Sequence, residues 1–181
     1  YGLSSHENVE IKLYNKANPL KPWKTMGRMH DKYLIADGKI YILGGRNTYN
    51  YFLGDFPGHK NFDRDVLVVC DEPQKDNSVN QLWNYFETIW EQEDCRYFHN
   101  SKKLADRQSV KKAVLELQEG YQQYFEVNKE KICDTDYADE TFETEKIILL
   151  SNPIHTQAKE PVVWYQLGEL MKNAKERVKI H

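Results

Sequence analysis

A histidine, a lysine and an asparagine in one short stretch of this chain could together handle a phosphate group. His30 and Lys32 are separated by one residue, and Gly44-Gly45-Arg46-Asn47 follows shortly afterwards. Side chains two apart in a strand point to the same face, so His30 and Lys32 would be presented together. An imidazole can act as acid, base or nucleophile near neutral pH, and a lysine supplies a fixed cation. Glycine at position 45 would let the backbone approach a ligand closely. The pattern predicts a site for a phosphate ester.

A β-hairpin is the element expected to position these residues. Asp37-Gly38 lies between two apolar-rich runs, which is a strong hairpin signal. We predict its strands at about 28–36 and 39–43. Asp37 would then be a turn residue, with a structural rather than a chemical role.

The rest of the chain alternates strand-like and helix-like patterns, which is typical of an α/β sandwich. We predict further strands at 9–14, 65–70 and 146–150, and a strand beginning at 178–181. We predict helices at about 109–125, from Pro161, and up to about Trp90 with Ser78 as the N-cap. The apolar run 65–70 indicates a strand buried on both faces. Segment 128–145 is acidic and poor in aliphatic residues, which indicates an exposed connection.

Composition limits the function classes. The 181 residues carry a net charge of −3, which gives no global attraction to nucleic acid or to an anionic membrane, although a local basic patch would be compatible with it. The three cysteines lack CxxC spacing, so they suggest neither a disulfide framework nor a zinc site. No segment is long and apolar enough to span a bilayer.

The complete pattern His30-x-Lys32, Asp37 and Gly44-Gly45-x-Asn47 resembles the motif of the phospholipase D superfamily, and its Gly-Gly-x-Asn form is similar to the cardiolipin-synthase-like branch. Residues 62–68 are similar to the Arg-Asp strand segment that follows the motif in that family. The resemblance continues through the helix that ends Phe86-Glu87-Thr88-Ile89-Trp90, and residues 161–180 resemble the opening of the second half of such enzymes.

The resemblance implies an incomplete phospholipase D-like α-β-α sandwich. Residues 1–127 would be the C-terminal part of the first half with the motif, 128–145 an acidic connection, and 146–181 the start of the second half. The active site in this family is built from two His-x-Lys motifs, and this chain has one. Either the second motif lies in a missing part of a longer protein, or a second copy of the chain supplies it. We favour the first explanation, and we therefore expect the isolated chain to be inactive or nearly so.

Roles for individual residues follow from the same resemblance. His30 would be either the nucleophile that forms a phosphohistidine or the general acid on the leaving alcohol. Lys32, Asn47 and Gly45 would bind the phosphate, where negative charge builds in the transition state. Asp65 would orient His30 through its other ring nitrogen. Arg46 could be a surface residue or could help at the phosphate.

The activity that the resemblance implies is a metal-independent phosphodiesterase or phosphatidyltransferase that acts on phospholipids without a cofactor. Cardiolipin synthesis from phosphatidylglycerol is the favoured version, at a membrane surface that we expect to be the bacterial cytoplasmic membrane. The acceptor could be water, glycerol or phosphatidylglycerol. Two alternatives stay open. A nuclease of the same superfamily would need a basic groove, so nucleic acid is the less expected partner. A catalytically inactive lipid-binding module would keep the fold but lack the second motif.

Overall fold

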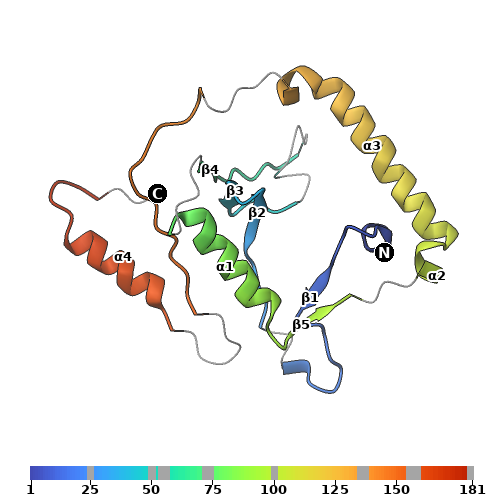
Figure 1. The fold of residues 1–181 in the computed structure, drawn as a ribbon, viewed down its shortest axis with the longest axis horizontal. Coiled ribbons are helices and arrows are strands. Elements are labelled where there is room, and N and C mark those ends of the chain that lie inside the picture. Colours follow the sequence, from blue (N-terminus) through green and yellow to red (C-terminus); the bar gives the residue numbers. More distant parts are fainter. Residues whose placement is uncertain are drawn as a thin grey trace. The chain divides into compact units, whose positions relative to one another are not determined.

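The computed structural model describes residues 1–23, 27–48, 52, 58–70, 76–98, 102–133, 139–153 and 160–178 (Figure 1). The chain divides into two compact units: unit 1 comprises Tyr1–Pro19 with Glu93–Glu145, and unit 2 comprises Leu20–Gln92 with Lys146–His181. Both units are built from helices and antiparallel strands, so the predicted α/β class is confirmed at that level. The division into two phospholipase D-like halves stays a prediction.

The sheet of unit 2 contains the predicted hairpin. Its three antiparallel strands are β2 (Lys32–Ala36), β3 (Ile40–Gly44) and β4 (Asp65–Val69), in that spatial order. Asp37 and Gly38 form the turn with φ of 53° and 65°, and the Lys39 amide donates to the Ala36 carbonyl at 3.1 Å. Positive φ at both positions is what the Asp-Gly pair favours. The hairpin is confirmed, although its first strand begins at Lys32 rather than near residue 28.

The register of the sheet decides which side chains share a face. Lys32 pairs with Gly44, which in turn pairs with Asp65. Directly paired residues in antiparallel strands point to the same face, so Lys32 and Asp65 lie on one face of the sheet. The next row of paired residues begins with Tyr33, and its side chains point to the opposite face. We call the face with Lys32 and Asp65 the site face and the opposite one the core face.

Helix α1 (Ser78–Trp90) packs on the core face. Val79 and Leu82 on α1 are 0% and 1% exposed, and they form the core with Tyr41 and Val68 of the sheet. The N-cap of this helix is Asn77 rather than the predicted Ser78, which is the first helical residue. Its side-chain oxygen accepts the Asn80 amide at 2.8 Å, which satisfies one of the unpaired amides of the first turn.

The site face carries exposed apolar side chains. Leu34 is 59% exposed and Ile42 is 41% exposed, and Val69 on β4 is also exposed. The prediction that residues 65–70 form a strand buried on both faces is therefore wrong. The apolar run reflects strand propensity, and among the described helices α1 covers the core face of the strand while the site face stays exposed. The three-layer α-β-α arrangement stays a prediction.

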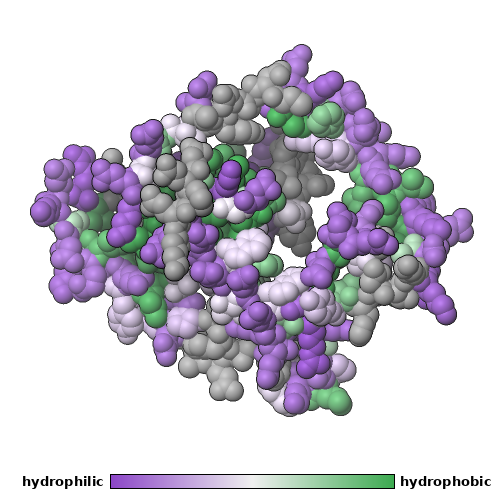
Figure 2. Space-filling view, in the orientation of Figure 1, coloured by the Kyte–Doolittle hydropathy of each residue, from purple (hydrophilic) through white to green (hydrophobic). Residues whose placement is uncertain are grey.

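Unit 1 contains the 3-10 turn η1 (Leu3–Ser5), the strand pair β1 (Lys12–Tyr14) and β5 (Cys95–Tyr97), and the helices α2 (Lys102–Ala105) and α3 (Gln108–Cys133). Strand β1 is shorter than the predicted strand 9–14. Helix α3 extends beyond the predicted 109–125, into the segment expected to be a connection. Hydrophobic side chains are exposed on an otherwise hydrophilic α3, and Figure 2 shows them as green patches.

The C-terminal part of the chain differs from its prediction in one element. Helix α4 (Val162–Lys172) follows Pro161 as predicted. Residues 146–150, however, form no strand. The Leu149 amide donates to the Gln81 side-chain oxygen on α1 at 3.0 Å, and the Leu149 side chain packs against the core. Burial against a helix thus replaces pairing with a strand. The strand expected at 178–181 lies almost wholly outside the described residues.

Among the described helices, none combines the length and the apolar character that crossing a membrane requires.

Tyr33 makes the stability of unit 2 sensitive to alkaline pH. Burial, reinforced by the Asp31 carboxylate, raises the pKa of Tyr33 from 10.0 to about 12. As the pH rises through this range, the unfolded chain loses the Tyr33 proton first, so the folded state loses stability between pH 10 and about 12. We expect the free energy of unfolding, measured in urea across this range, to fall more steeply for the native chain than for Tyr33→Phe. An equal fall in the free energy of unfolding for both proteins would contradict the raised pKa of Tyr33.

Candidate functional site

His30 and Lys32 are in direct contact at the start of β2. His30 is exposed and lies two residues before Lys32, the first residue of the strand. The Lys32 Nζ lies 2.9 Å from His30 Nδ1 and also donates to the His30 carbonyl oxygen. The structure thus brings together the two residues that the spacing placed on one face.

This contact assigns the proton on the imidazole. A lysine ammonium can only donate hydrogen bonds, so His30 Nδ1 accepts, and Nε2 carries the proton of the neutral ring. In this state Nε2–H can donate a hydrogen bond to a leaving oxygen, whereas transfer of a proton to that oxygen requires the imidazolium, which also carries a proton on Nδ1. A nucleophilic role through Nε2 requires the other tautomer. Both roles expected for His30 therefore require a proton on Nδ1, the atom that accepts from Lys32 in this structure.

Gly44 lies between Lys32 and Asp65 in the same row of the sheet, and Asp65 occupies the space beside it. A Cβ at position 44 would lie 2.7 Å from the Asp65 Cγ and 2.9 Å from its Cα. Real side chains do not tolerate such distances, so Gly44 is the residue that lets the Asp65 carboxylate lie over β3.

Gly45 has the same relation to a second carboxylate. A Cβ at position 45 would lie 2.6 Å from the Asp63 Oδ2. The two glycines therefore make room for two acidic side chains of the chain itself. The Asp63 carboxylate thus explains why a residue without a side chain is needed at position 45. The predicted contribution of Gly45 to phosphate binding stays a prediction.

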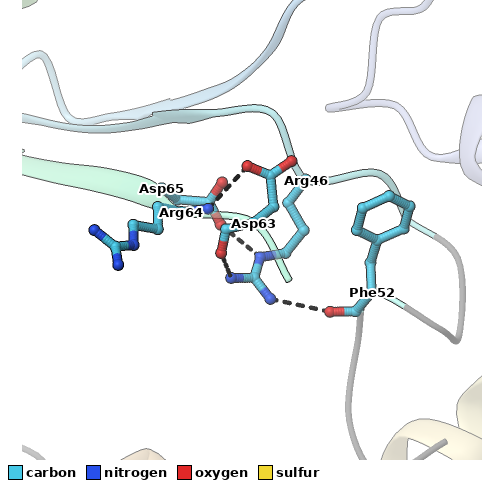
Figure 3. A network of polar contacts seen from close by, with 5 residues as sticks. All are labelled: Arg46, Phe52, Asp63, Arg64 and Asp65. Atoms are coloured by element: carbon cyan, nitrogen blue, oxygen red, sulfur yellow. Dashed lines mark hydrogen bonds and ion pairs between the residues drawn. The ribbon is translucent and has the colours of Figure 1, made fainter. Parts of the chain in front are cut away.

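Arg46, two residues after β3, makes three hydrogen bonds, two of which reach the start of β4 (Figure 3). Its Nε donates to Asp65 Oδ2 at 2.7 Å, its Nη2 to the Asp63 carbonyl at 2.8 Å, and its Nη1 to the Phe52 carbonyl at 3.0 Å. The flat guanidinium, with five N–H donors in a fixed fork, suits such a junction. The Arg46 and Asp65 side chains are 36% and 25% exposed, so the pair is partly solvated.

Asp65 was predicted to orient His30, and the structure shows it paired with Arg46. Among the described residues, no hydrogen bond joins Asp65 to His30. Asp65 nevertheless lies on the site face in the same row as Lys32, so its predicted role stays a prediction. Asn47 is half-buried, three residues beyond the end of β3. Its role at the phosphate also stays a prediction.

Sequence reasoning missed a contact between Asp31, which lies between His30 and Lys32, and Tyr85. The hydroxyl of Tyr85 on α1 donates to the Asp31 carboxylate, 54 positions away in the sequence. A signal for Tyr85 did exist, because it lies three residues after Leu82 and so continues the packed stripe of the helix. Nothing in the sequence indicated its partner.

In the part of the chain that the structure describes, no group of three histidine, cysteine or acidic side chains is arranged to hold a metal ion.

Comparison of the chain with protein-family models, with curated proteins and with solved structures gave no match. The phospholipase D resemblance rests on the motif residues quoted above, and the function drawn from it is a proposal.

Proposed function

We propose that this chain supplies one half of a phosphodiester-cleaving site of the phospholipase D kind, on an incomplete α-β-α sandwich. The observation that carries the proposal is the contact of Lys32 Nζ with His30 Nδ1 at 2.9 Å, at the exposed start of β2. It places a proton-transfer group and a fixed cation side by side, as cleavage of a phosphate ester needs.

The proposed reaction has two steps and no metal ion. In the first, a histidine nitrogen attacks phosphorus, the bond from phosphorus to the leaving oxygen breaks, and a second histidine protonates that oxygen. In the second, water or a lipid alcohol attacks phosphorus and gives its proton to the second histidine, and the bond from phosphorus to the histidine nitrogen breaks. His30 is one of the two, and the other comes from a second His-x-Lys half. Lys32 stabilises the charge on the non-bridging oxygens, with Asn47 and Gly45 as further donors.

Two observations favour a phospholipid over a nucleic acid as substrate. The net charge is −3, whereas binding to a polyphosphate backbone is driven by clustered lysine and arginine. Leu34 and Ile42 are exposed on the same sheet face as Lys32. A molecule with both a phosphate and an apolar part matches such a face better than a polyanion does. We therefore propose a cardiolipin-synthase-like phosphatidyltransferase or phosphodiesterase at a membrane surface, the bacterial cytoplasmic membrane being our preferred location.

One competition assay tests this proposal. The natural full-length protein is incubated with phosphatidylglycerol vesicles and a labelled single-stranded oligonucleotide in the same tube, with and without EDTA. We expect cardiolipin or phosphatidic acid as product, an intact oligonucleotide and no effect of EDTA. Oligonucleotide cleavage without a lipid product would favour the nuclease. Vesicle binding without either product would favour an inactive lipid-binding module.

A further inference from the structure

Asp31, the residue between His30 and Lys32, is tied to helix α1. Its Oδ2 accepts a hydrogen bond from the Tyr85 hydroxyl. Asp31 lies just before the first paired residue of β2, so the ladder of strand hydrogen bonds, which begins at Lys32, does not hold it. The bond to Tyr85 is therefore a tertiary contact that fixes the chain upstream of the sheet.

The position of the Tyr85 hydroxyl is itself well defined. Leu82, one turn earlier on α1, is 1% exposed and anchors the helix in the core. The Tyr85 ring packs edge-on against the Tyr33 ring, with centroids 6.2 Å apart and planes at 66°. This geometry is a favourable one for two aromatic rings. The hydroxyl is thus presented to Asp31 by a ring that the core holds in place.

Alternation along the strand connects this anchor to the site. Asp31 and Tyr33 face α1, so His30 and Lys32 on either side of Asp31 project toward the opposite face. There the Lys32 ammonium bonds both to His30 Nδ1 and to the His30 carbonyl. The tripeptide is therefore held from two sides, by Tyr85 at its centre and by Lys32 across its ends.

We propose that Tyr85 and Asp31 are positioning residues that hold the imidazole of His30 and the ammonium of Lys32 side by side where the phosphate would bind. The inference rests on the proposed function and adds a part of the machinery outside the motif residues. Neither residue touches the reacting atoms. Their effect is on geometry, to which catalysis is sensitive because small displacements of a catalytic group cost large factors in rate.

Tyr85→Phe is the informative variant, because it removes the hydroxyl and keeps the ring, the packing and every charge. In the full-length protein we expect kcat to fall about tenfold while KM for phosphatidylglycerol changes less than about twofold. Asp31→Asn keeps an acceptor for the Tyr85 hydroxyl, so it should retain most of the rate. Asp31→Ala should reproduce the loss. Tyr121→Phe, at an exposed tyrosine of α3, is the matched control and should leave kcat unchanged.

A second readout does not depend on activity. Two-bond ¹H–¹⁵N spectra of the ring nitrogens report the tautomer of His30, for which the contact with Lys32 predicts a proton on Nε2. We expect Tyr85→Phe and Asp31→Ala to shift the His30 signals toward a mixture of tautomers, and Asp31→Asn and Tyr121→Phe to leave them as in the native protein.

The outcomes separate this inference from the proposed function. If the protein cleaves no phosphodiester but the His30 signals respond as expected, the proposed function fails and the positioning contact stands. If Tyr85→Phe and Asp31→Ala leave both the signals and kcat unchanged, the positioning role is overturned. Should Tyr85→Phe lose its near-ultraviolet circular dichroism, Asp31→Ala decides alone, since it truncates an exposed side chain.

Discussion

Replacing His30 with alanine is expected to lower phosphodiester turnover by the full protein about 10²–10⁴-fold. The imidazole is the proton-handling group of the pair that Lys32 completes, and alanine supplies neither a lone pair nor a proton. Because the His30 side chain is exposed, the variant should fold normally, which urea unfolding can verify. Steady-state hydrolysis or transfer with phosphatidylglycerol gives the rate.

His59→Ala is the matched control for this substitution. His59 is also exposed, belongs to the same unit, and has its Nε2 2.8 Å from the Asn61 Oδ1 rather than beside a lysine. It should turn over at the native rate. Residual activity of His30→Ala within a few-fold of the native protein would refute the assignment of His30.

The same variant can tell the two roles of His30 apart. A substrate with a strongly acidic leaving phenol needs little protonation of the departing oxygen, so loss of a general acid should matter much less for it than for phosphatidylglycerol. Loss of the nucleophile should affect both substrates fully. Quenching the protein with ³²P-labelled substrate in alkaline detergent, which preserves the P–N bond, adds a direct test, because a phosphohistidine trapped in His30→Ala would place the nucleophile on the other histidine.

Gly44→Ala is expected to destabilise unit 2 by about 1–3 kcal/mol, the usual cost of forcing an extra methyl group into a filled space. The new Cβ would meet the Asp65 side chain and, at 2.9 Å, the Asp65 Cα. Because the second of these atoms belongs to the backbone of β4, relief requires the two strands to separate locally. Urea unfolding should show a lower midpoint with a similar slope.

Asp65→Ala provides the coupled control. Removing the carboxylate deletes the Cγ contact but leaves the backbone contact, so Gly44→Ala should cost less in this background than in the native one. An equal cost in both backgrounds would show that the Asp65 carboxylate does not lie over Gly44. Gly120→Ala, in the middle of α3 where nothing beyond the adjoining helix backbone lies within 4 Å of the added Cβ, should be neutral or stabilising.

The parts of the fold that could be predicted are those encoded locally. Asp37-Gly38 specifies a tight turn because both residues accept positive φ, and the 3.6-residue spacing of apolar side chains specifies α1. The prediction of a strand at 146–150 was wrong because an apolar run indicates burial but does not identify the element that it packs against. Leu149 is partly buried against the core and pairs with no strand, and such a choice between partners is made by tertiary contacts.

The candidate site shows the same division. The contact between His30 and Lys32 follows from two-residue alternation, so the spacing alone predicted it. Arg46 and Asp65 are 19 positions apart, and their pairing depends on the register of β3 with β4. The bond from Tyr85 to Asp31 depends on how α1 lies across the sheet. Contacts of this kind become predictable only when the packing of elements is known.

The exposed apolar face of the unit 2 sheet links the folding of this unit to its surroundings. Apolar surface left in water forgoes about 25 cal/mol for every Å² that burial would remove. Anything that covers Leu34 and Ile42 in the folded state, and does not bind the unfolded chain, shifts the folding equilibrium by mass action. The melting temperature of the unit should then depend on the concentration of whatever covers that face. For this sheet, folding and association would be a single coupled equilibrium.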